Sequence, residues 1–209
     1  MMQLEEYLNS EILPRYDDFD AAHRRDHALR VIEQGLYLAQ FYDVDRAMVL
    51  TACACHDIGL GEGREYHHLA SGRIIRELPL SRWFTREQVE TIAQAAEDHR
   101  ASSKNEPRSI YGRIVAEADR QIEPETVVRR TIQYGLDHYP ELSKEGHWQR
   151  MLEHLHEKYA EGGYLKLWIP ESPNASKITE LRELIKDEAA LRRIFESVFK
   201  HETQSGRRI

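Results

Sequence analysis

The chain has 209 residues with 41% hydrophobic side chains, which suits one large domain or a domain with an extension. Its formal net charge of -7 argues against general nucleic-acid binding, because neutralising phosphates requires a basic patch. No apolar run approaches the roughly 20 residues needed to span a bilayer, and the N-terminus is too polar for a signal peptide, so we expect a cytoplasmic protein without membrane contact.

The first half of the chain has the periodicity of helices. Apolar residues recur at three- and four-residue steps over residues 26–42, which predicts an amphipathic helix. Asp45 is placed to cap a second helix that runs toward His56. A third helix is expected over residues 68–78, because Pro79 cannot continue it.

The helical pattern continues in the middle of the chain. Thr85 and Gln88 have the spacing of a capping box, which predicts a helix to about residue 98. Ser109 can cap a further helix to about residue 121. A polar loop is expected between these two helices.

The C-terminal part is also predicted to be helical. Pro124 helps to start a helix, and residues 180–202 place their apolar side chains on one broad stripe. The best strand candidate, YLKLWI at residues 164–169, is short. We therefore predict an all-α fold and a single domain, with these bounds: 1–209 for the whole, about 20–125 for its core and about 126–205 for a helical extension.

The stretch TACACHDIGLGEGREYHH, residues 51–68, contains several unusual features. Cys53 and Cys55 lack the second thiol pair of a zinc ribbon and are expected in the core. The glycines of GLGEG do not have the spacing of a phosphate-binding loop, so we expect them to turn the chain after Asp57.

Histidine and aspartate gather near the predicted helix ends. If those ends converge, nitrogen and oxygen ligands line one pocket and suit one or two divalent ions: Fe, Mn, Ni, Co or Zn, with Mg as a further candidate. The alternative is that these side chains are caps or surface residues. The positions are His27, the pair His56 and Asp57, the pair His67 and His68, His99 and Asp119. The remaining histidines in polar sequence, such as His147, are expected at the surface.

At these residues the chain resembles the HD-domain superfamily of metal-dependent phosphohydrolases. DHALRV, ACHDIG and AEADR match the family's His, His-Asp doublet and distant Asp at His27, His56, Asp57 and Asp119. HHLAS and AAEDHR are similar to the two further histidines of its two-metal members. The stretch from residue 165 to 202 also resembles the tail of small bacterial stand-alone HD proteins.

The resemblance implies His68 and His99 as the two further ligands. His68 is preferred to His67 because the family pattern is a His, two residues and then a Ser, which fits Ser71. Adjacent helical residues point about 100° apart, so one ion is expected to take only one of this pair.

The resemblance further implies an HD-type helical bundle with additional C-terminal helices and a bound divalent metal. The expected activity is cleavage of a phosphomonoester or phosphodiester, a nucleotide among the candidates, by metal-activated water, with Asp57 as the catalytic carboxylate bridging two metals. The expected partner is a small phosphorylated substrate, and a homo-oligomer is left open. Predicted substrate contacts are Arg30, Lys104 and Arg108.

Two alternatives remain from the sequence: a di-iron oxygenase of the same fold and a non-catalytic metal- or nucleotide-binding module. Leu60 stands where cyclic-dinucleotide phosphodiesterases and HD-fold inositol oxygenases have Lys, and no GYP motif follows His99. These departures argue against both of those specific subclasses.

Overall fold

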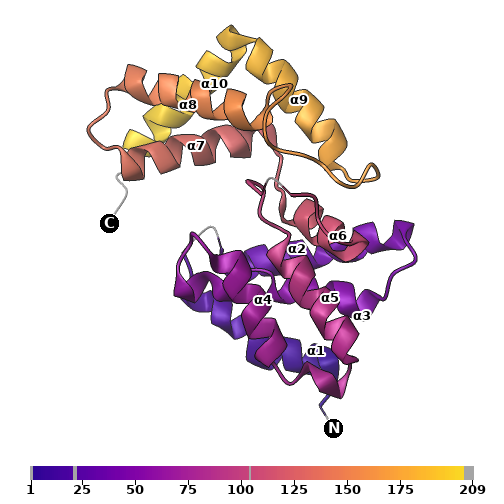
Figure 1. The fold of residues 1–209 in the computed structure, drawn as a ribbon. Coiled ribbons are helices and arrows are strands. Elements are labelled where there is room, and N and C mark those ends of the chain that lie inside the picture. The colour runs from indigo at the N-terminus through magenta and orange to yellow at the C-terminus, as the bar shows by residue number, and fades with distance from the viewer. Residues whose placement is uncertain (1, 21–22, 104, 205–209) are drawn as a thin grey trace. The chain divides into compact units, whose positions relative to one another are not determined.

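The structure is a computed structural model that describes residues 2–20, 23–103 and 105–204. These residues form ten α-helices joined by short helical turns, and no strand is found among them, which confirms the all-α fold (Figure 1). The short strand candidate at residues 164–169 does not form a strand, since this stretch is irregular. The backbone N–H of Trp168 donates to the Glu117 carboxylate at 2.8 Å, so a buried side chain is the partner of this amide.

The helices cluster into two compact units, and each is described by itself. The N-terminal unit comprises Met1–Arg120 and Leu167–Ser172, and the C-terminal unit comprises Gln121–Lys166 and Pro173–Ile209. The single domain over residues 1–209 stays a prediction. Within the described residues, no helix combines the length and the apolar character that crossing a bilayer requires.

The N-terminal unit begins with three short consecutive helical pieces and continues with five longer helices. The elements are α1 (Leu4–Tyr7), η1 (Leu8–Ile12), η2 (Leu13–Asp18), α2 (Arg25–Leu38), η3 (Ala39–Phe41), α3 (Arg46–Cys55), η4 (Ile58–Glu62), α4 (His67–Glu77), η5 (Leu80–Arg82), α5 (Arg86–Glu97) and α6 (Ile110–Asp119).

The predicted helix starts are confirmed where a polar side chain caps the backbone. The Asp45 carboxylate accepts from the backbone N–H of Ala47 at 2.8 Å at the start of α3. Thr85 and Gln88 form the capping box of α5, and the Ser109 hydroxyl caps α6. Each cap satisfies backbone donors that have no partner inside the helix.

Helix α3 lies at the centre of the N-terminal unit. Residues 51–55 have no exposed surface, as the small apolar side chains of this stretch predict. Helices α2, α5 and α6 all contact α3, and α4 lies beside α5 (Figure 1). The C-terminal end of α3 is therefore in the interior, and the polar residues that follow it are buried as well.

Gly59 and Gly63 follow α3, and a side chain is disfavoured at each position for a different physical reason. Gly63 has a φ of 116°, which fits the expected turn. At Gly59 the reason is space, because a Cβ there would stand 2.4 Å from the carbonyl oxygen of His67 and 2.5 Å from the amide nitrogen of Ser71. The Gly59 N–H also donates to the Ser71 hydroxyl at 2.9 Å. The missing side chain thus lets α4 start directly against the turn after Asp57.

The described residues of the C-terminal unit form four helices, of which α7 and α8 pack side by side (Figure 1). The apolar stripe over residues 180–202 is shared by two helices, because the helical conformation is interrupted at Asp187. Its carboxylate accepts from the Ala190 N–H at 2.9 Å and competes with helix continuation. The helices are α7 (Pro124–His138), α8 (Lys144–Tyr159), α9 (Asn174–Lys186) and α10 (Glu188–Gln204).

One histidine of the C-terminal unit differs from the prediction of a surface position. His147 is only 3% exposed, and its ring centroid lies 5.6 Å from that of Phe199. It occupies the buried stripe of α8 together with Trp148 and Met151. His147 lies four residues before Met151 and so falls on the apolar face of α8, and this spacing was the signal for burial in the sequence.

Candidate metal centre

Six histidine and aspartate side chains converge from the ends of five helices of the N-terminal unit. They form two groups, in each of which one ligand atom per residue lies within 4.8 Å of the others. Group one contains His27 in the first turn of α2, His56 after α3 and Asp119 at the end of α6. Group two contains Asp57, His67 at the start of α4 and His99 after α5.

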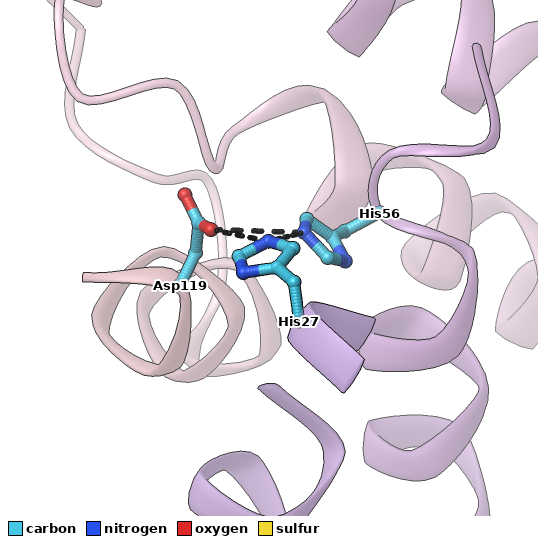
Figure 2. Close-up of side chains that lie close together, drawn as sticks. All are labelled: His27, His56 and Asp119. Atoms are coloured by element: carbon cyan, nitrogen blue, oxygen red, sulfur yellow. Dashed lines mark hydrogen bonds and ion pairs between the residues drawn. The ribbon is translucent and has the colours of Figure 1, made fainter. Parts of the chain in front are cut away.

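Group one brings two imidazoles and a carboxylate together (Figure 2). The Nε2 atoms of His27 and His56 are 3.2 Å apart. Asp119 Oδ1 lies 3.2 Å from Nε2 of His27 and 3.7 Å from Nε2 of His56. Figure 2 shows the three polar ends pointing toward one another, which is the arrangement that a shared cation requires.

Group two has the same kinds of ligand atom. The Nε2 atoms of His67 and His99 are 3.1 Å apart. Each of these nitrogens lies 3.3 Å from Asp57 Oδ1. His99 is only 3% exposed, so this group is also largely shielded from solvent.

Asp57 joins the two groups through its two carboxylate oxygens. While Oδ1 faces group two, Oδ2 lies 3.2 Å from His56 Nε2 and 3.6 Å from His27 Nε2. The residue is 2% exposed. A carboxylate in this position can bridge two cations, which is the role that the resemblance implied for Asp57.

Backbone carbonyls hold three of the histidines in one tautomer. The Nδ1 atom lies 2.8 Å from the Cys53 oxygen in His56, 2.7 Å from the Arg64 oxygen in His67 and 2.5 Å from the Ala96 oxygen in His99. A carbonyl can only accept, so each Nδ1 carries the proton and donates it. When neutral, as metal binding requires, each of these rings presents the lone pair of Nε2 to its group.

The two groups differ in their electrostatics. Burial lowers the pKa of His56, but the neighbouring Asp57 carboxylate outweighs burial and raises that pKa well above its usual value. Burial also opposes charge on His27, yet hydrogen bonds to Asp119 and Asp57 raise its pKa. In group two, burial and then His99 lower the pKa of His67. Group one thus stabilises positive charge, and His67 favours the neutral form.

The residues present fit a divalent cation. Oδ1 of Asp57 is buried without a hydrogen-bond partner among the described residues. Burial raises the pKa of Asp57, but His56 and then His27 outweigh burial and lower that pKa well below its usual value, so the carboxylate is ionised. A buried negative charge requires compensation, and a cation held by Nε2 and carboxylate oxygens provides it.

The two adjacent histidines of α4 are placed differently in the structure. His67 lies in group two, and His68, the ligand that the family pattern favours, does not. Neighbouring helical residues point in different directions, and His67 is the one that faces Asp57. His68 keeps a buried Nδ1 without a hydrogen-bond partner, and burial followed by His99 lowers its pKa to about 4.

Two of the three predicted substrate-contact residues, Arg30 and Arg108, form ion pairs with nearby carboxylates. Arg30 donates to Asp26 at 2.8 Å on the exposed side of α2. Arg108 is tied to acidic residues at the end of α5, with Glu97 at 2.6 Å and Asp98 at 2.9 Å. Lys104 lies outside the described residues. Substrate binding by these three side chains stays a prediction.

Two polar residues near the groups were missed in the sequence. His23 Nδ1 lies 2.9 Å from Asp20 Oδ1, and its ring centroid is 5.8 Å from that of His27. Arg100 directly follows His99, and its guanidinium donates to the carbonyl of Glu65 in the loop before α4. The available signals were the four-residue spacing from His23 to His27 and the direct succession of His99 and Arg100.

A comparison with known families agrees with this geometry. Residues 24–121 match the family model of the HD domain. The matched segment includes every member of both ligand groups. Residues 24–121 of this chain therefore match an HD domain, in agreement with the resemblance in the sequence.

The fold is also similar to that of a solved structure. The crystal structure of a predicted HD superfamily hydrolase from an uncultured Thermotogales bacterium matches with a TM-score of 0.51 and 23% sequence identity. The match covers 72% of this chain and 83% of the other chain. At this identity the likeness shows the fold alone. No curated protein sequence matches the chain.

Proposed function

We propose that this protein is a two-metal phosphohydrolase that cleaves a phosphomonoester or phosphodiester in a small phosphorylated molecule. The observation that carries the proposal is the buried Asp57 carboxylate, which directs one oxygen to each of two three-residue groups. The net charge of -7 supports a small substrate in preference to nucleic acid.

The two groups would hold the metals through Nε2 atoms and carboxylate oxygens, which suit Fe, Mn, Ni, Co or Zn, with Mg as a further candidate. A pair of divalent ions in such a site activates water near neutral pH and offsets negative charge on a phosphoryl group. His56, His67 and His99 are oriented for ligation by their Nδ1–H bonds to carbonyls.

Two side chains beside the ligand groups are suited to contact the substrate. Because His23 directs Nδ1 to Asp20, its Nε2 lies on the opposite edge of the ring, near His27. Arg100 places a guanidinium between the residues that follow α5 and the loop that leads to His67. The Arg100 guanidinium is a hydrogen-bond donor for phosphoryl oxygens, and His23 would donate from Nε2 only when both of its ring nitrogens carry a proton; both residues form part of the proposal.

The proposal is tested by metal analysis of the purified protein, followed by a phosphate-release screen across nucleotides and other phosphoesters with added Mn²⁺, Fe²⁺ or Co²⁺. His56→Ala serves as the variant and His201→Ala as the matched control, since the His201 side chain is 66% exposed. We expect metal and phosphate release in the wild type and the control, and loss of both in His56→Ala.

The other outcomes separate the alternatives. Oxygen consumption by the iron-loaded protein without phosphate release would favour the oxygenase. Bound metal with neither reaction would favour a non-catalytic binding module. Equal metal content in the wild type, His56→Ala and Asp57→Ala would contradict the metal site itself.

A further inference from the structure

The segment that precedes the HD domain is part of the same core. Residues 4–18 lie before the family match at residue 24, yet Tyr7, Leu8, Ile12, Leu13 and Tyr16 are all buried in the core that contains α3. Its pieces η1 and η2 contact α3 and α2 respectively. The helices that carry His27 and His56 are therefore packed against residues outside the HD domain.

Tyr16 is the residue of this segment that reaches the metal centre. It has no exposed surface, and its hydroxyl donates to the Ala54 carbonyl at 2.9 Å. The same hydroxyl oxygen accepts from the Asp57 backbone N–H at 3.2 Å. Tyr16 thus connects the last turn of α3 with the residue that joins the two ligand groups.

These bonds occur where α3 ends. In a continuing helix the Asp57 N–H would donate to the Cys53 carbonyl, four residues earlier. Here that carbonyl lies 2.8 Å from His56 Nδ1, and Asp57 has left the helical conformation, with a φ of -112° and a ψ of 7°. The Tyr16 hydroxyl supplies an acceptor for the freed N–H and a donor for a terminal carbonyl of α3.

We propose that Tyr16 is a positioning residue of the metal centre, because its hydroxyl fixes the backbone at Asp57 and so directs the carboxylate to both ligand groups. This inference rests on the proposed metal-dependent function. It extends the functional unit of the chain beyond residues 24–121. Without the hydroxyl, the Asp57 amide has no fixed acceptor, and the carboxylate is free to turn away from one group.

Tyr16→Phe in the full-length chain separates this role from packing. The aromatic ring, which lies 5.4 Å from Phe19 and 6.4 Å from the His56 ring, is retained, and only the hydroxyl is lost. Tyr7→Phe is the matched control. Tyr7 belongs to the same segment and core, is 5% exposed, and packs its ring 5.1 Å from Trp83.

The measurement is Co²⁺ titration of the metal-free proteins, followed by visible absorption and by the number of ions bound. We expect Tyr16→Phe to bind Co²⁺ about 10-fold or more weakly with an altered absorption spectrum, as for other changes of a residue that supports a ligand. Tyr7→Phe should match the wild type in both readouts. A purely structural role would lower the melting temperature of Tyr16→Phe and leave Co²⁺ affinity and spectrum unchanged.

The failures are distinguishable. If the wild type binds Co²⁺ and Tyr16→Phe binds it with equal affinity and spectrum, the role of Tyr16 is wrong and the proposed function stands. If the wild type binds no Co²⁺, the metal site is wrong and this inference falls with it. Should Tyr16→Phe not fold, hydrogen exchange of the wild type decides: a slowly exchanging Asp57 amide supports the inference, and fast exchange in the folded metal-free protein overturns it.

Discussion

The two ligand groups contain the same types of side chain but are built differently. In group one, His27 and His56 face carboxylate oxygens of both Asp119 and Asp57. In group two, His67 and His99 face Oδ1 of Asp57. A cation in group one is therefore close to more negative charge, and we expect it to bind more tightly than a cation in group two.

The packing contacts that hold the side chains of the two groups in place differ as well. Group one comes from α2, α3 and α6, which contact one another in the core. Group two depends on where α4 begins, and that start is held by close packing at Gly59 and by the Ser71 hydroxyl. The same types of ligand atom thus do not imply the same metal affinity, because the contacts that each ligand side chain makes with the rest of the protein decide how firmly it is held.

The largest effect is expected from Asp57→Asn, because this residue belongs to both groups. The amide keeps the size of the side chain but removes the charge that two cations would share. Metal analysis should show that both ions are lost, and phosphate release should fall by more than the about 10- to 100-fold that is typical when a supporting residue is changed. Retention of one tightly bound ion would mean that group one is independent of Asp57.

His67→Ala and His68→Ala form a matched pair that tests group two. Removing His67 deletes a ligand atom 3.3 Å from Asp57 Oδ1, so one of two ions should be lost. His68→Ala should keep both ions and most of the activity. The stoichiometry from Co²⁺ titration checks this, and the reverse pattern would restore the preference for His68 that the sequence suggested.

Gly59→Ala and Gly61→Ala test the support of group two. A Cβ at Gly59 meets backbone atoms at 2.4 and 2.5 Å, so we expect a loss of about 1–3 kcal/mol in stability and a weaker second ion. A Cβ at Gly61 meets nothing within 4 Å, and its effect should stay within about 0.5 kcal/mol. Urea unfolding and Co²⁺ titration measure both, and equal stabilities would show that α4 can shift freely.

The stabilisation of the protein by bound Mn²⁺ should depend on pH mainly through the histidines of group one. The folded pKa values of His27 and His56 are raised above the usual 6.5, so their stabilising charge is fully present below that value and is lost as pH rises through the folded pKa values. Bound metal replaces these protons. The stabilisation by Mn²⁺ should therefore grow from about pH 6 to about pH 8.

Thermal unfolding with and without Mn²⁺ measures this growth. We expect the Mn²⁺-induced rise in Tm to be larger near pH 8 by about 3 °C or more, since each kcal/mol shifts Tm by about 2–4 °C in a chain of this size. His67→Ala should keep the pH dependence and His27→Ala should reduce it. A pH-independent rise in all three proteins would contradict the assignment to group one.

The smallest effect is expected from Arg30→Ala. Its exposed ion pair with Asp26 contributes less than about 1 kcal/mol to stability. If that pair is its main role, KM for an identified substrate should change less than about twofold, which is under about 0.5 kcal/mol. A much larger increase in KM, measured with Arg86→Ala as an exposed control, would confirm the substrate contact predicted from the sequence.

Much of the fold and of the site was predictable because the signals are local. Asp45, Thr85 and Ser109 cap the helices that their sequence patterns predict. His27 and Asp119 could be named as candidate ligands because a family pattern orders them along the chain, and the structure brings them together in group one. The break at Asp187 was missed because an apolar stripe continues across it, and only the side-chain cap interrupts the backbone.

By itself the sequence determined the helical class, the caps and the types of ligand, since these depend on residue chemistry and on spacing within one helix. Tertiary structure decided that His67 and not His68 faces Asp57. The two side chains point about 100° apart around α4, and the packing of α4 against η4 determines which of them is directed toward Asp57. Tertiary structure also brought Tyr16 to the backbone of Asp57, 41 residues away. Contacts of that separation form only when distant helices share a core, and no local pattern encodes them.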